Sequence, residues 1–224
     1  MAGTLIVLEG TDGSGKSTQF ERLCRLMAAE NRDFQRLVFP QYSEPSSALL
    51  KMYLQGEFGS HPSDVNAYAA STFYAVDRYA SYKKVWGRFY EDGGLVLADR
   101  YTTSNAVHQA AKLPEEERDG FFRWLMEFEC GKLGLPEPAL VLYLDVPTEL
   151  AVQNLRRREA ERHTTGDIHE VDTGYLRTCR ETARHAAQVL GWRTVSCTDA
   201  SGAMRTVDDI GAEIEALVRT VLDR

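Results

Sequence analysis

The segment from Gly10 to Ser17 constrains the possible folds of this chain more than any other part of its sequence. It reads Gly-Thr-Asp-Gly-Ser-Gly-Lys-Ser and matches the phosphate-loop pattern G-x-x-x-x-G-K-[ST]. The apolar run from Thr4 to Leu8 precedes it, and apolar residues at the spacing of one helix face follow it. Glycines in such a loop let backbone N–H groups converge on phosphate oxygens, and the helix N-terminus adds partial positive charge. The segment therefore predicts a nucleoside triphosphate site between a buried strand and a helix.

Two side chains of this loop have specific expected contacts. Lys16 is expected to reach the outer phosphates, and Ser17 is expected to bind Mg²⁺. The remaining residues of the expected phosphate-binding set are Gly10, Thr11, Asp12, Gly13, Ser14, Gly15 and Thr18. The loop does not identify a reaction by itself, because motor proteins, transporters, GTPases and small-molecule kinases share it. The sequence contains neither N-K-x-D nor L-S-G-G-Q, which disfavours GTPases and transporter ATPases.

Five aliphatic runs predict buried strands, at Thr4 to Leu8, Arg36 to Phe39, Leu95 to Ala98, Ala139 to Leu144 and Trp192 to Cys197. Long helical patterns cover Val65 to Tyr90, Arg118 to Lys132, Tyr175 to Leu190 and Val207 to Leu222. Strands that alternate with helices predict an α/β fold of the P-loop NTPase type, with a five-stranded parallel sheet and helices on both faces. Its ligand site is expected at the carboxyl ends of the strands.

We expect a single domain over residues 1–224, because no linker or repeat interrupts the pattern. A short lid is expected over approximately residues 153–172. Its first part, residues 156–163, is strongly basic, and residues 164–172 contain few large apolar side chains.

Composition restricts the class of protein further. Hydrophobic residues make up 43% of the chain and charged residues 26%, as in ordinary globular domains. The net charge of -7 disfavours binding to nucleic acid or to a membrane surface, because both require broad positive patches. The four cysteines show no metal-binding spacing and are expected to be reduced core thiols. The first apolar run is too short for a signal peptide, and the expected location is the cytoplasm.

Polar residues directly after the third predicted strand suggest a second substrate site. Asp99 ends this strand and suits magnesium or its water shell, and the guanidinium fork of Arg100 suits a phosphate group. An ion pair that only fixes the loop is the alternative. Tyr74 and Arg78 share one helix face and offer an aromatic surface and a cation to a base, although a tyrosine at this spacing is more often part of the core. Asp145 also ends a strand, but helix-start signals follow it, so we interpret it as structural.

Taken together, these motifs resemble the thymidylate kinase family. The matching strings are, in chain order, Glu9-Gly-x-Asp12-Gly-x-Gly-Lys-Ser, Phe39-Pro-x-Tyr42, Tyr74-Ala-x-Asp-Arg78, Asp99-Arg-Tyr-x-x-Ser-Asn105, Leu135-Pro-x-Pro138 and an arginine-rich lid ending Asp167-x-x-Glu170. The resemblance implies an enzyme of dTTP biosynthesis that transfers the γ-phosphate of ATP to dTMP, giving dTDP and ADP. It also implies Mg²⁺ as cofactor and a homodimer formed through helix packing.

The resemblance implies a role for individual residues of the acceptor site. Asp12 is expected to accept a hydrogen bond from the 3'-hydroxyl or to help hold Mg²⁺, Tyr74 to stack on thymine, and Arg100 to hold the acceptor phosphate. Arg78 and Asn105 are expected to contact the base. The full dTMP-binding set is Asp12, Phe39, Tyr42, Tyr74, Arg78, Arg100, Ser104, Asn105 and His108. The full metal set is Ser17, Asp12, Asp99 and Glu170. His108 either borders the sugar or is structural, and the role of Gln109 stays open.

With Gly13, the chain resembles the family members that have no catalytic arginine in the phosphate loop. Those members supply this arginine from the lid. Arg158 and Arg162 are expected to do this, because they stand at i and i+4 on one helix face. Arg156 is a further candidate, whereas Arg157 lies on a different face. The lid departs from the usual D-R-x-E string, since it reads Asp167-Ile-His169-Glu170. The expected catalytic set is Lys16, Asp12, Arg100, Arg158 and Arg162.

Two alternative functions remain at this point. A deoxynucleoside kinase would phosphorylate a nucleoside 5'-hydroxyl and would require a general base beside it; the Glu-Arg-Ser loop typical of such enzymes is absent here. A catalytically silent nucleotide-binding module is expected to have lost Lys16, Ser17 or Arg100, and all three are present.

Overall fold

The centre of the molecule is a parallel β-sheet, seen in a computed structural model that describes residues 2–162 and 173–223. Within these residues the sheet has five strands in the order β2-β3-β1-β4-β5, and every neighbouring pair is parallel. The strands are β1 Thr4–Glu9, β2 Phe34–Val38, β3 Leu95–Asp99, β4 Leu140–Asp145 and β5 Arg193–Ser196. The five predicted strands are therefore confirmed, with ends that differ by one or two residues, and so is the α/β fold class.

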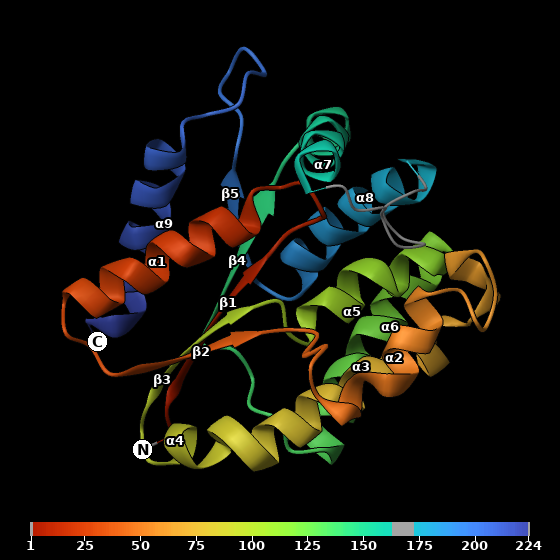
Figure 1. The fold of residues 1–224 in the computed structure, drawn as a ribbon, viewed down its shortest axis with the longest axis horizontal. Helices are drawn as coiled ribbons and strands as arrows, with labels where there is room; N and C mark the ends of the chain where they lie inside the picture. Colours follow the sequence, from red (N-terminus) through yellow and green to blue (C-terminus); the bar gives the residue numbers. More distant parts are fainter. Residues whose placement is uncertain (1, 163–172, 224) are drawn as a thin grey trace.

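Helices cover both faces of this sheet (Figure 1). Within the described residues, the helices that cover the sheet or pack on one another are α1 Lys16–Ala29, α2 Ala48–Leu54, α3 Ala67–Ser81, α4 Gly87–Glu91, α5 Thr103–His108, α6 Glu115–Met126, α7 Thr148–Arg162, α8 Thr173–Val189 and α9 Val207–Leu222. Short 3₁₀ turns lie at Pro45–Ser47, Pro62–Asp64 and Ala110–Lys112, and π-helical turns lie at Tyr82–Trp86 and Glu127–Lys132. The predicted helix over Val65 to Tyr90 corresponds to α3, the first π-helical turn and α4 in succession.

Two apolar clusters fix these helices to the sheet. On one face, α1 and α9 pack on β1, β3 and β4 through residues such as Phe20, Leu97 and Ile214. On the opposite face, Trp86 and Tyr101 pack against Leu5, Val96 and their neighbours. Burial of these side chains stabilises the fold by roughly 25 cal/mol for each Å² of apolar surface removed from water.

The strand register brings the ends of β1 and β3 together. Leu8 lies opposite Asp99, so the loop that follows β1 and the loop that follows β3 begin side by side. This is the carboxyl edge of the sheet, where ligands bind in open parallel folds. The register thus places the phosphate loop next to Asp99 and Arg100.

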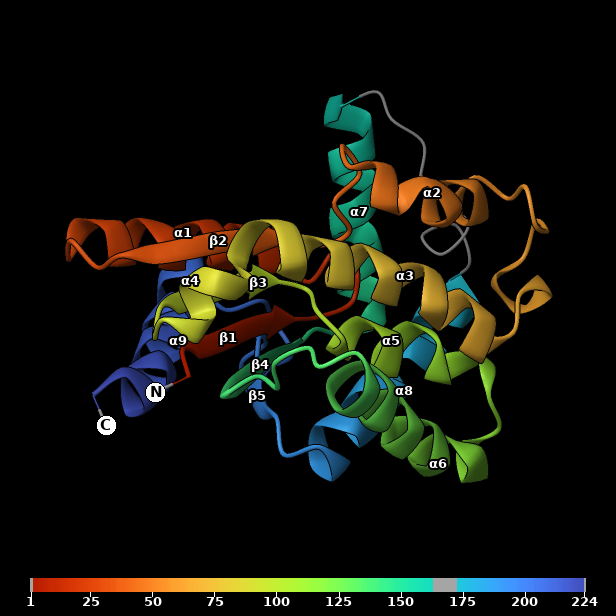
Figure 2. The same ribbon diagram turned by 90° about the horizontal axis from the view of Figure 1, so that it is seen from below.

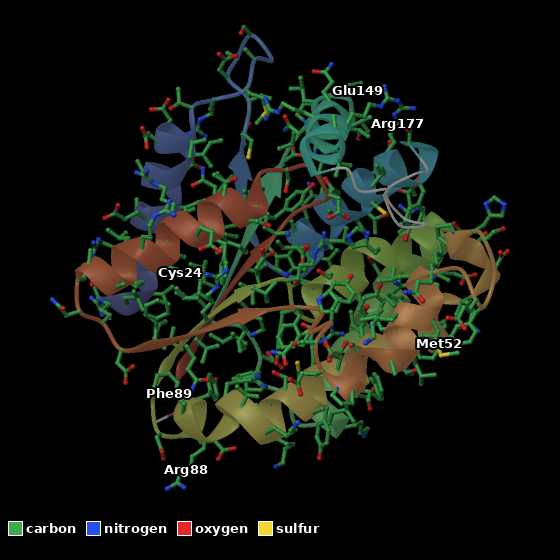
Figure 3. All side chains as sticks on the ribbon, in the orientation of Figure 1. Cys24, Met52, Arg88, Phe89, Glu149 and Arg177 are labelled. Carbon is green, nitrogen blue, oxygen red and sulfur yellow. The ribbon has the colours of Figure 1, made fainter. Side chains whose placement is uncertain are left out.

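Helix α7 begins in the body of the molecule, and its C-terminal end projects beyond it (Figure 2). Its first turn is fixed to α8 by an ion pair between Glu149 and Arg177, 3.0 Å apart (Figure 3). The helix covers the first part of the expected lid, whereas residues 163–172 lie outside the described part of the chain, as do the side chains of Arg158 and Arg162. The lid itself therefore stays a prediction.

Two smaller expectations concern cysteines and membranes. Each of the four cysteines is a free thiol, and Cys24, Cys179 and Cys197 are buried. Burial raises the pKa of the Cys24 thiol to about 11, as expected for an inert core thiol. Among the described residues, no helix is both long enough and apolar enough to span a membrane.

Candidate active site

The phosphate loop wraps the beginning of α1 in the geometry that its glycines allow. Gly13 and Gly15 both adopt left-handed backbone conformations, with φ of 81°. Lys16 and Ser17 open the helix and turn towards Asp99 at the end of β3. The Lys16 ammonium lies 2.7 Å from Asp99 Oδ1, and the Ser17 hydroxyl donates to Asp99 Oδ2 at 3.1 Å. The loop and the strand end thus form one polar cluster.

This cluster suits a magnesium ion. Ser17 and Asp99 present a hydroxyl and a carboxylate side by side, and Mg²⁺ prefers such oxygen ligands. No group of three or more His, Cys, Asp or Glu residues that could hold a metal occurs in the described residues. Magnesium in phosphoryl-transfer sites needs only one or two protein ligands, because nucleotide phosphates and water supply the others. Ser17 and Asp99 therefore fit the ion, whereas Glu170 lies outside the described residues.

A cavity of about 620 Å³ runs along the phosphate loop. Residues of α7 form one of its walls and include Asn154 and Arg157. Asn154 Nδ2 donates to the carbonyl oxygen of Gly13 at 2.9 Å, so α7 packs directly on the loop. A Cβ atom at Gly13 would lie 2.1 Å from the carbonyl oxygen of Ala151. The backbone of α7 thus occupies the space that a side chain at position 13 would need.

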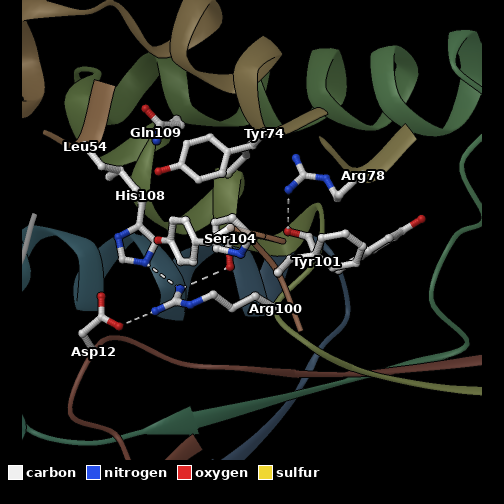
Figure 4. A pocket seen from close by; sticks show the side chains of 13 residues that line it. Asp12, Leu54, Tyr74, Arg78, Arg100, Tyr101, Ser104, His108 and Gln109 are labelled. Carbon is white, nitrogen blue, oxygen red and sulfur yellow. Dashed lines mark hydrogen bonds and ion pairs between the residues drawn. The ribbon is translucent and has the colours of Figure 1, made fainter. Parts of the chain in front are cut away.

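Arg100 lies at the centre of the neighbouring site, where the sequence predicts that the acceptor binds. Its backbone is left-handed, with φ of 68°, which strains a residue other than glycine and turns the side chain back over the phosphate loop. Arg100 Nη2 donates to Asp12 Oδ1 at 2.5 Å, and Nη1 donates to Ser104 Oγ at 3.3 Å (Figure 4). The pair joins the loop after β1 to the loop after β3.

Neighbouring charges shift the pKa values of both Asp12 and Arg100. Burial alone would raise the pKa of Asp12, but Arg100, His108 and Lys16 lower it below its ordinary value. Burial alone would lower the pKa of Arg100, but the carboxylates of Asp12, Glu9 and Asp99 raise it above its ordinary value. Both side chains therefore remain charged at neutral pH.

Glu9 supports both loops from beneath. This carboxylate is fully buried, and its oxygens accept hydrogen bonds from Gly10 N at 2.9 Å, Thr103 Oγ1 at 2.6 Å and Ser104 Oγ at 2.7 Å. Arg100 Nη1 lies 3.5 Å from Glu9 Oε1. A single carboxylate thus connects the start of the phosphate loop, the start of α5 and the arginine between them.

The acceptor pocket has a volume of about 130 Å³ and lies beyond Arg100. All nine residues of the predicted dTMP-binding set line it, together with Pro40, Leu54, Tyr101 and Gln109. Aromatic rings from the loop after β2, from α3 and from the loop after β3 surround it, and Arg78 and Asn105 provide its polar wall. Glu129 binds both of these polar residues from outside the pocket.

Two polar residues at the end of α5 are nearly or fully buried in this pocket. His108 Nε2 lies 3.0 Å from Arg100 Nη1. Because arginine only donates, this contact is a hydrogen bond in the tautomer whose Nε2 accepts. Gln109 is fully buried, and neither its amide nitrogen nor its carbonyl oxygen has a hydrogen-bond partner. Such an unpaired amide is unfavourable unless a ligand or water satisfies it.

The residues that the sequence predicts for the dTMP site line one pocket, but three residues that organise this pocket had no predicted role. Glu9 was part of a matching string, and its signal was a charged residue directly after an apolar strand. Gln109 had no assigned role, although its position one helical turn after Asn105 placed it on the same face. Glu129 gave no signal that distinguished it from other helical carboxylates.

Comparisons with known proteins were made on sequence and on fold. A family model described as thymidylate kinase matches residues 8–200. The chain is 37% identical to a thymidylate kinase of Mycobacterium tuberculosis (strain CDC 1551 / Oshkosh) over 157 residues, covering 69% of this chain and 71% of the relative. It is 29% identical to the human thymidylate kinase over 226 residues, covering 99% and 94%. The fold is similar to that of a thymidylate kinase from Candida albicans, with a TM-score of 0.71 at 20% identity over 98% of this chain and 92% of the other.

Proposed function

The chain belongs to the thymidylate kinase family and phosphorylates dTMP to dTDP with ATP, and we propose how its residues divide this reaction. The main observation behind this proposal is the 2.5 Å hydrogen bond between Arg100 and Asp12, which joins the phosphate loop to the acceptor pocket. An ATP bound on the loop and a dTMP bound in the pocket bring their phosphates together at this pair. Positioning and charge neutralisation are the main requirements of phosphoryl transfer.

The donor side uses the residues of the phosphate loop. Backbone N–H groups of Gly10 to Thr18 cradle the phosphates, and Lys16 neutralises charge on the outer ones. Ser17 and Asp99 would hold Mg²⁺, which supplies further charge neutralisation when it is bound. Lys16 and Ser17 already contact Asp99, so the cluster is organised before a nucleotide arrives.

The acceptor side uses Arg100 to hold the dTMP phosphate with its planar fork of N–H donors. Asp12 orients Arg100 and also faces the sugar, where it accepts a hydrogen bond from the 3'-hydroxyl. Because Asp12 remains ionised at neutral pH, it serves as an acceptor throughout the reaction.

The base occupies the inner part of the pocket. Tyr74 and Phe39 supply the aromatic surface, and Arg78 and Asn105 contact the polar edge of thymine. Gln109 adds a third polar contact, because its unpaired amide lines the same pocket and requires both a donor and an acceptor. Ser104 and His108 hold Arg100 in place beside the base.

Charge that develops on the transferring phosphoryl group is neutralised from α7 and the following lid, through Arg158 and Arg162. The support is the position of α7, which packs on the phosphate loop and leaves no room for a side chain at Gly13. Arg157 joins these two residues as a candidate, because it lines the cavity along the loop. The fold does not favour Arg156 in the same way, since this residue is absent from the described lining of that cavity.

The assembly we propose is a cytoplasmic homodimer that pairs through the exposed face of α3. Tyr68, Val76 and Tyr79 form an apolar row along this helix and are 41%, 53% and 41% exposed. A second copy of the chain is the occupant that the family resemblance implies for such a row, and ATP and dTMP are available in the cytoplasm for dTTP synthesis.

The activity is tested by measuring ADP formation with ATP and Mg²⁺ in the presence of dTMP, dUMP, dCMP or thymidine. We expect turnover with dTMP. Turnover with dUMP is expected to be roughly 10- to 200-fold weaker, because dUMP lacks the methyl group. Little turnover is expected with dCMP or thymidine. The Lys16→Ala variant serves as the background control and is expected to be inactive while remaining folded. Preference for thymidine would indicate a deoxynucleoside kinase instead, and absence of turnover with every acceptor would indicate a silent nucleotide-binding module.

A further inference from the structure

Glu129 is a fully buried carboxylate in the π-helical turn Glu127–Lys132, after α6. Its two oxygens accept from Arg78 Nε at 2.6 Å and from Arg78 Nη2 at 2.5 Å. A third donor, Asn105 Nδ2, lies 3.1 Å from Glu129 Oε1. Buried ion pairs add little net stability compared with apolar packing, so this arrangement calls for another explanation. Glu129 contacts two residues that line the acceptor pocket and does not line the pocket itself.

The hydrogen bonds of Asn105 fix the orientation of its amide. Asn105 Nδ2 donates one hydrogen to Glu129 Oε1 and the other to the carbonyl oxygen of Ser71 at 3.2 Å. Both neighbours are acceptors only, so the reverse orientation would place the amide oxygen against two other oxygens. Both hydrogens of the Asn105 amide are therefore used, and its oxygen is the atom that can bind a ligand in the pocket. It can only accept.

Glu129 also holds the guanidinium of Arg78 in place, and this group donates in every orientation. The Glu129 carboxylate accepts the Nε hydrogen and one Nη2 hydrogen of Arg78. The carbonyl oxygen of Tyr101 accepts from Arg78 Nη1 at 3.3 Å (Figure 4). Of the five N–H groups of an arginine, two remain, and they can only donate. The polar wall of the pocket thus combines a fixed donor from Arg78 with a fixed acceptor from Asn105.

This donor and acceptor pair matches one kind of pyrimidine. Thymine and uracil carry an acceptor oxygen at C4 beside a hydrogen-bond donor at N3. Cytosine carries a donor amino group at C4 beside an acceptor at N3, so it would leave two buried polar groups mismatched. We propose that Glu129 is a positioning residue that sets the polarity of this wall and thereby selects keto pyrimidine nucleotides over amino pyrimidine nucleotides. The inference rests on the proposed function, because it takes dTMP as the occupant of the pocket.

The test uses two substitutions of Glu129. Glu129→Gln keeps the size of the side chain but presents an NH₂ group to Arg78 or to Asn105, which frees the Asn105 amide to reverse. Glu129→Asp keeps the charge, so it protects the fold, but it is one methylene too short to reach both partners. Asp145→Asn is the matched control, since Asp145 forms a similar bidentate pair with Arg180 at 2.7 and 3.3 Å, away from the acceptor pocket.

Two ratios are measured for every variant: kcat/KM for dTMP over dCMP, and the equilibrium affinity for dTMP over dCMP by calorimetric titration. We expect both Glu129 variants to lower these ratios by about tenfold to a hundredfold, mainly through a higher KM for dTMP, with the KM for ATP unchanged within about twofold. The Asp145→Asn variant is expected to lose thermal stability and to keep the ratios of the parent.

The outcomes separate this inference from the proposed function. Ratios within about twofold of the parent in both Glu129 variants would overturn the role of Glu129 while leaving the kinase activity intact. A parent protein that does not turn over dTMP would overturn the proposed function, and the affinity ratios would still report on Glu129. A parent protein that prefers dCMP would overturn both.

Discussion

At the scale of single residues, the candidate site is held together by buried charges, such as Glu9 and Glu129, that do not line its two pockets. Glu9 is the clearest case, because it accepts three hydrogen bonds from two different loops. A buried carboxylate requires such partners, and each partner is in turn held in place by the carboxylate. The position of Arg100 is therefore set partly by the last residue of the central strand β1.

We predict that Glu9→Gln lowers kcat/KM for dTMP by about tenfold or more and destabilises the fold by about 1 to 3 kcal/mol. A glutamine retains one acceptor oxygen but places an NH₂ group against donors and removes the negative charge beside Arg100. Steady-state kinetics and thermal unfolding measure the two effects. Glu21→Gln is the control, because Glu21 forms an exposed ion pair with Arg36. Equal, small effects in both variants would show that Glu9 does not organise the site.

Lys112 illustrates a different consequence of burial. Its ammonium donates to Tyr53 Oη and to the carbonyl oxygen of Val65, both at 2.9 Å. Burial lowers the pKa of Lys112 from 10.5 to about 7 in the folded protein. Between pH 7 and pH 10.5 the unfolded chain thus binds more protons at this residue than the folded protein does, and stability rises with pH over that range.

We predict that the parent gains stability relative to Lys112→Met as the pH rises from about 6 to about 9. The buried charge is unfavourable at the lower pH in the parent, and the methionine variant has no such charge. Each kcal/mol corresponds to about 2 to 4 °C in the unfolding temperature for a chain of this size. Thermal unfolding of both proteins across this pH range measures the difference. A constant difference would mean that Lys112 keeps an ordinary pKa.

At the scale of elements, α7 packs directly on the phosphate loop at Gly13. We predict that Gly13→Ala is more destabilising than Gly134→Ala. Both glycines have positive φ, of 81° and 70°, so both substitutions strain the backbone by about 1 to 2 kcal/mol. Only at Gly13 would the new Cβ also meet the Ala151 carbonyl oxygen, whereas no atom lies within 4 Å at Gly134.

Measurements of thermal unfolding and of turnover separate the backbone strain from the clash between the new Cβ and α7. Overpacking adds about 1 to 3 kcal/mol at Gly13, and the displacement of α7 is expected to lower kcat as well. Gly134→Ala is expected to keep the turnover of the parent. Similar unfolding temperatures and turnover for the two variants would show that α7 accommodates a side chain at this position without consequence.

Elements also show where sequence reasoning succeeded and where it did not. The strands were predictable because continuous aliphatic runs such as Leu95 to Ala98 are typical of parallel strands buried on both faces. Helix α5 was not predicted, because all six of its residues are buried and most are polar, so it has no apolar face to detect. The same reason hid Glu129 and Gln109. Residues that line or support a polar pocket break the pattern on which sequence prediction depends.

At the scale of the whole molecule, α3 connects the acceptor pocket to the outer surface. One face of this helix carries Tyr74 and Arg78 into the pocket, and another exposes Tyr68, Val76 and Tyr79. Tyr68 also packs edge-on against Trp124 of α6, with 4.7 Å between ring centroids, so the exposed row continues an ordered aromatic cluster. Exposed apolar side chains that gather on one helix face are typical of a protein interface.

We therefore predict that Val76→Asp converts a dimer into a monomer and raises the KM for dTMP more than the KM for ATP. The aspartate would place a charge in the centre of the interface, where it lacks a partner. Loss of the second copy also removes the support on the outer face of α3, whose inner face holds the base. Light scattering during size-exclusion chromatography measures the mass, and steady-state kinetics measures the two KM values. Val189→Asp is the control, because Val189 is a similarly exposed valine at the end of α8. If both variants remained dimers with unchanged kinetics, the interface would lie elsewhere on the molecule and α3 would not couple it to the base.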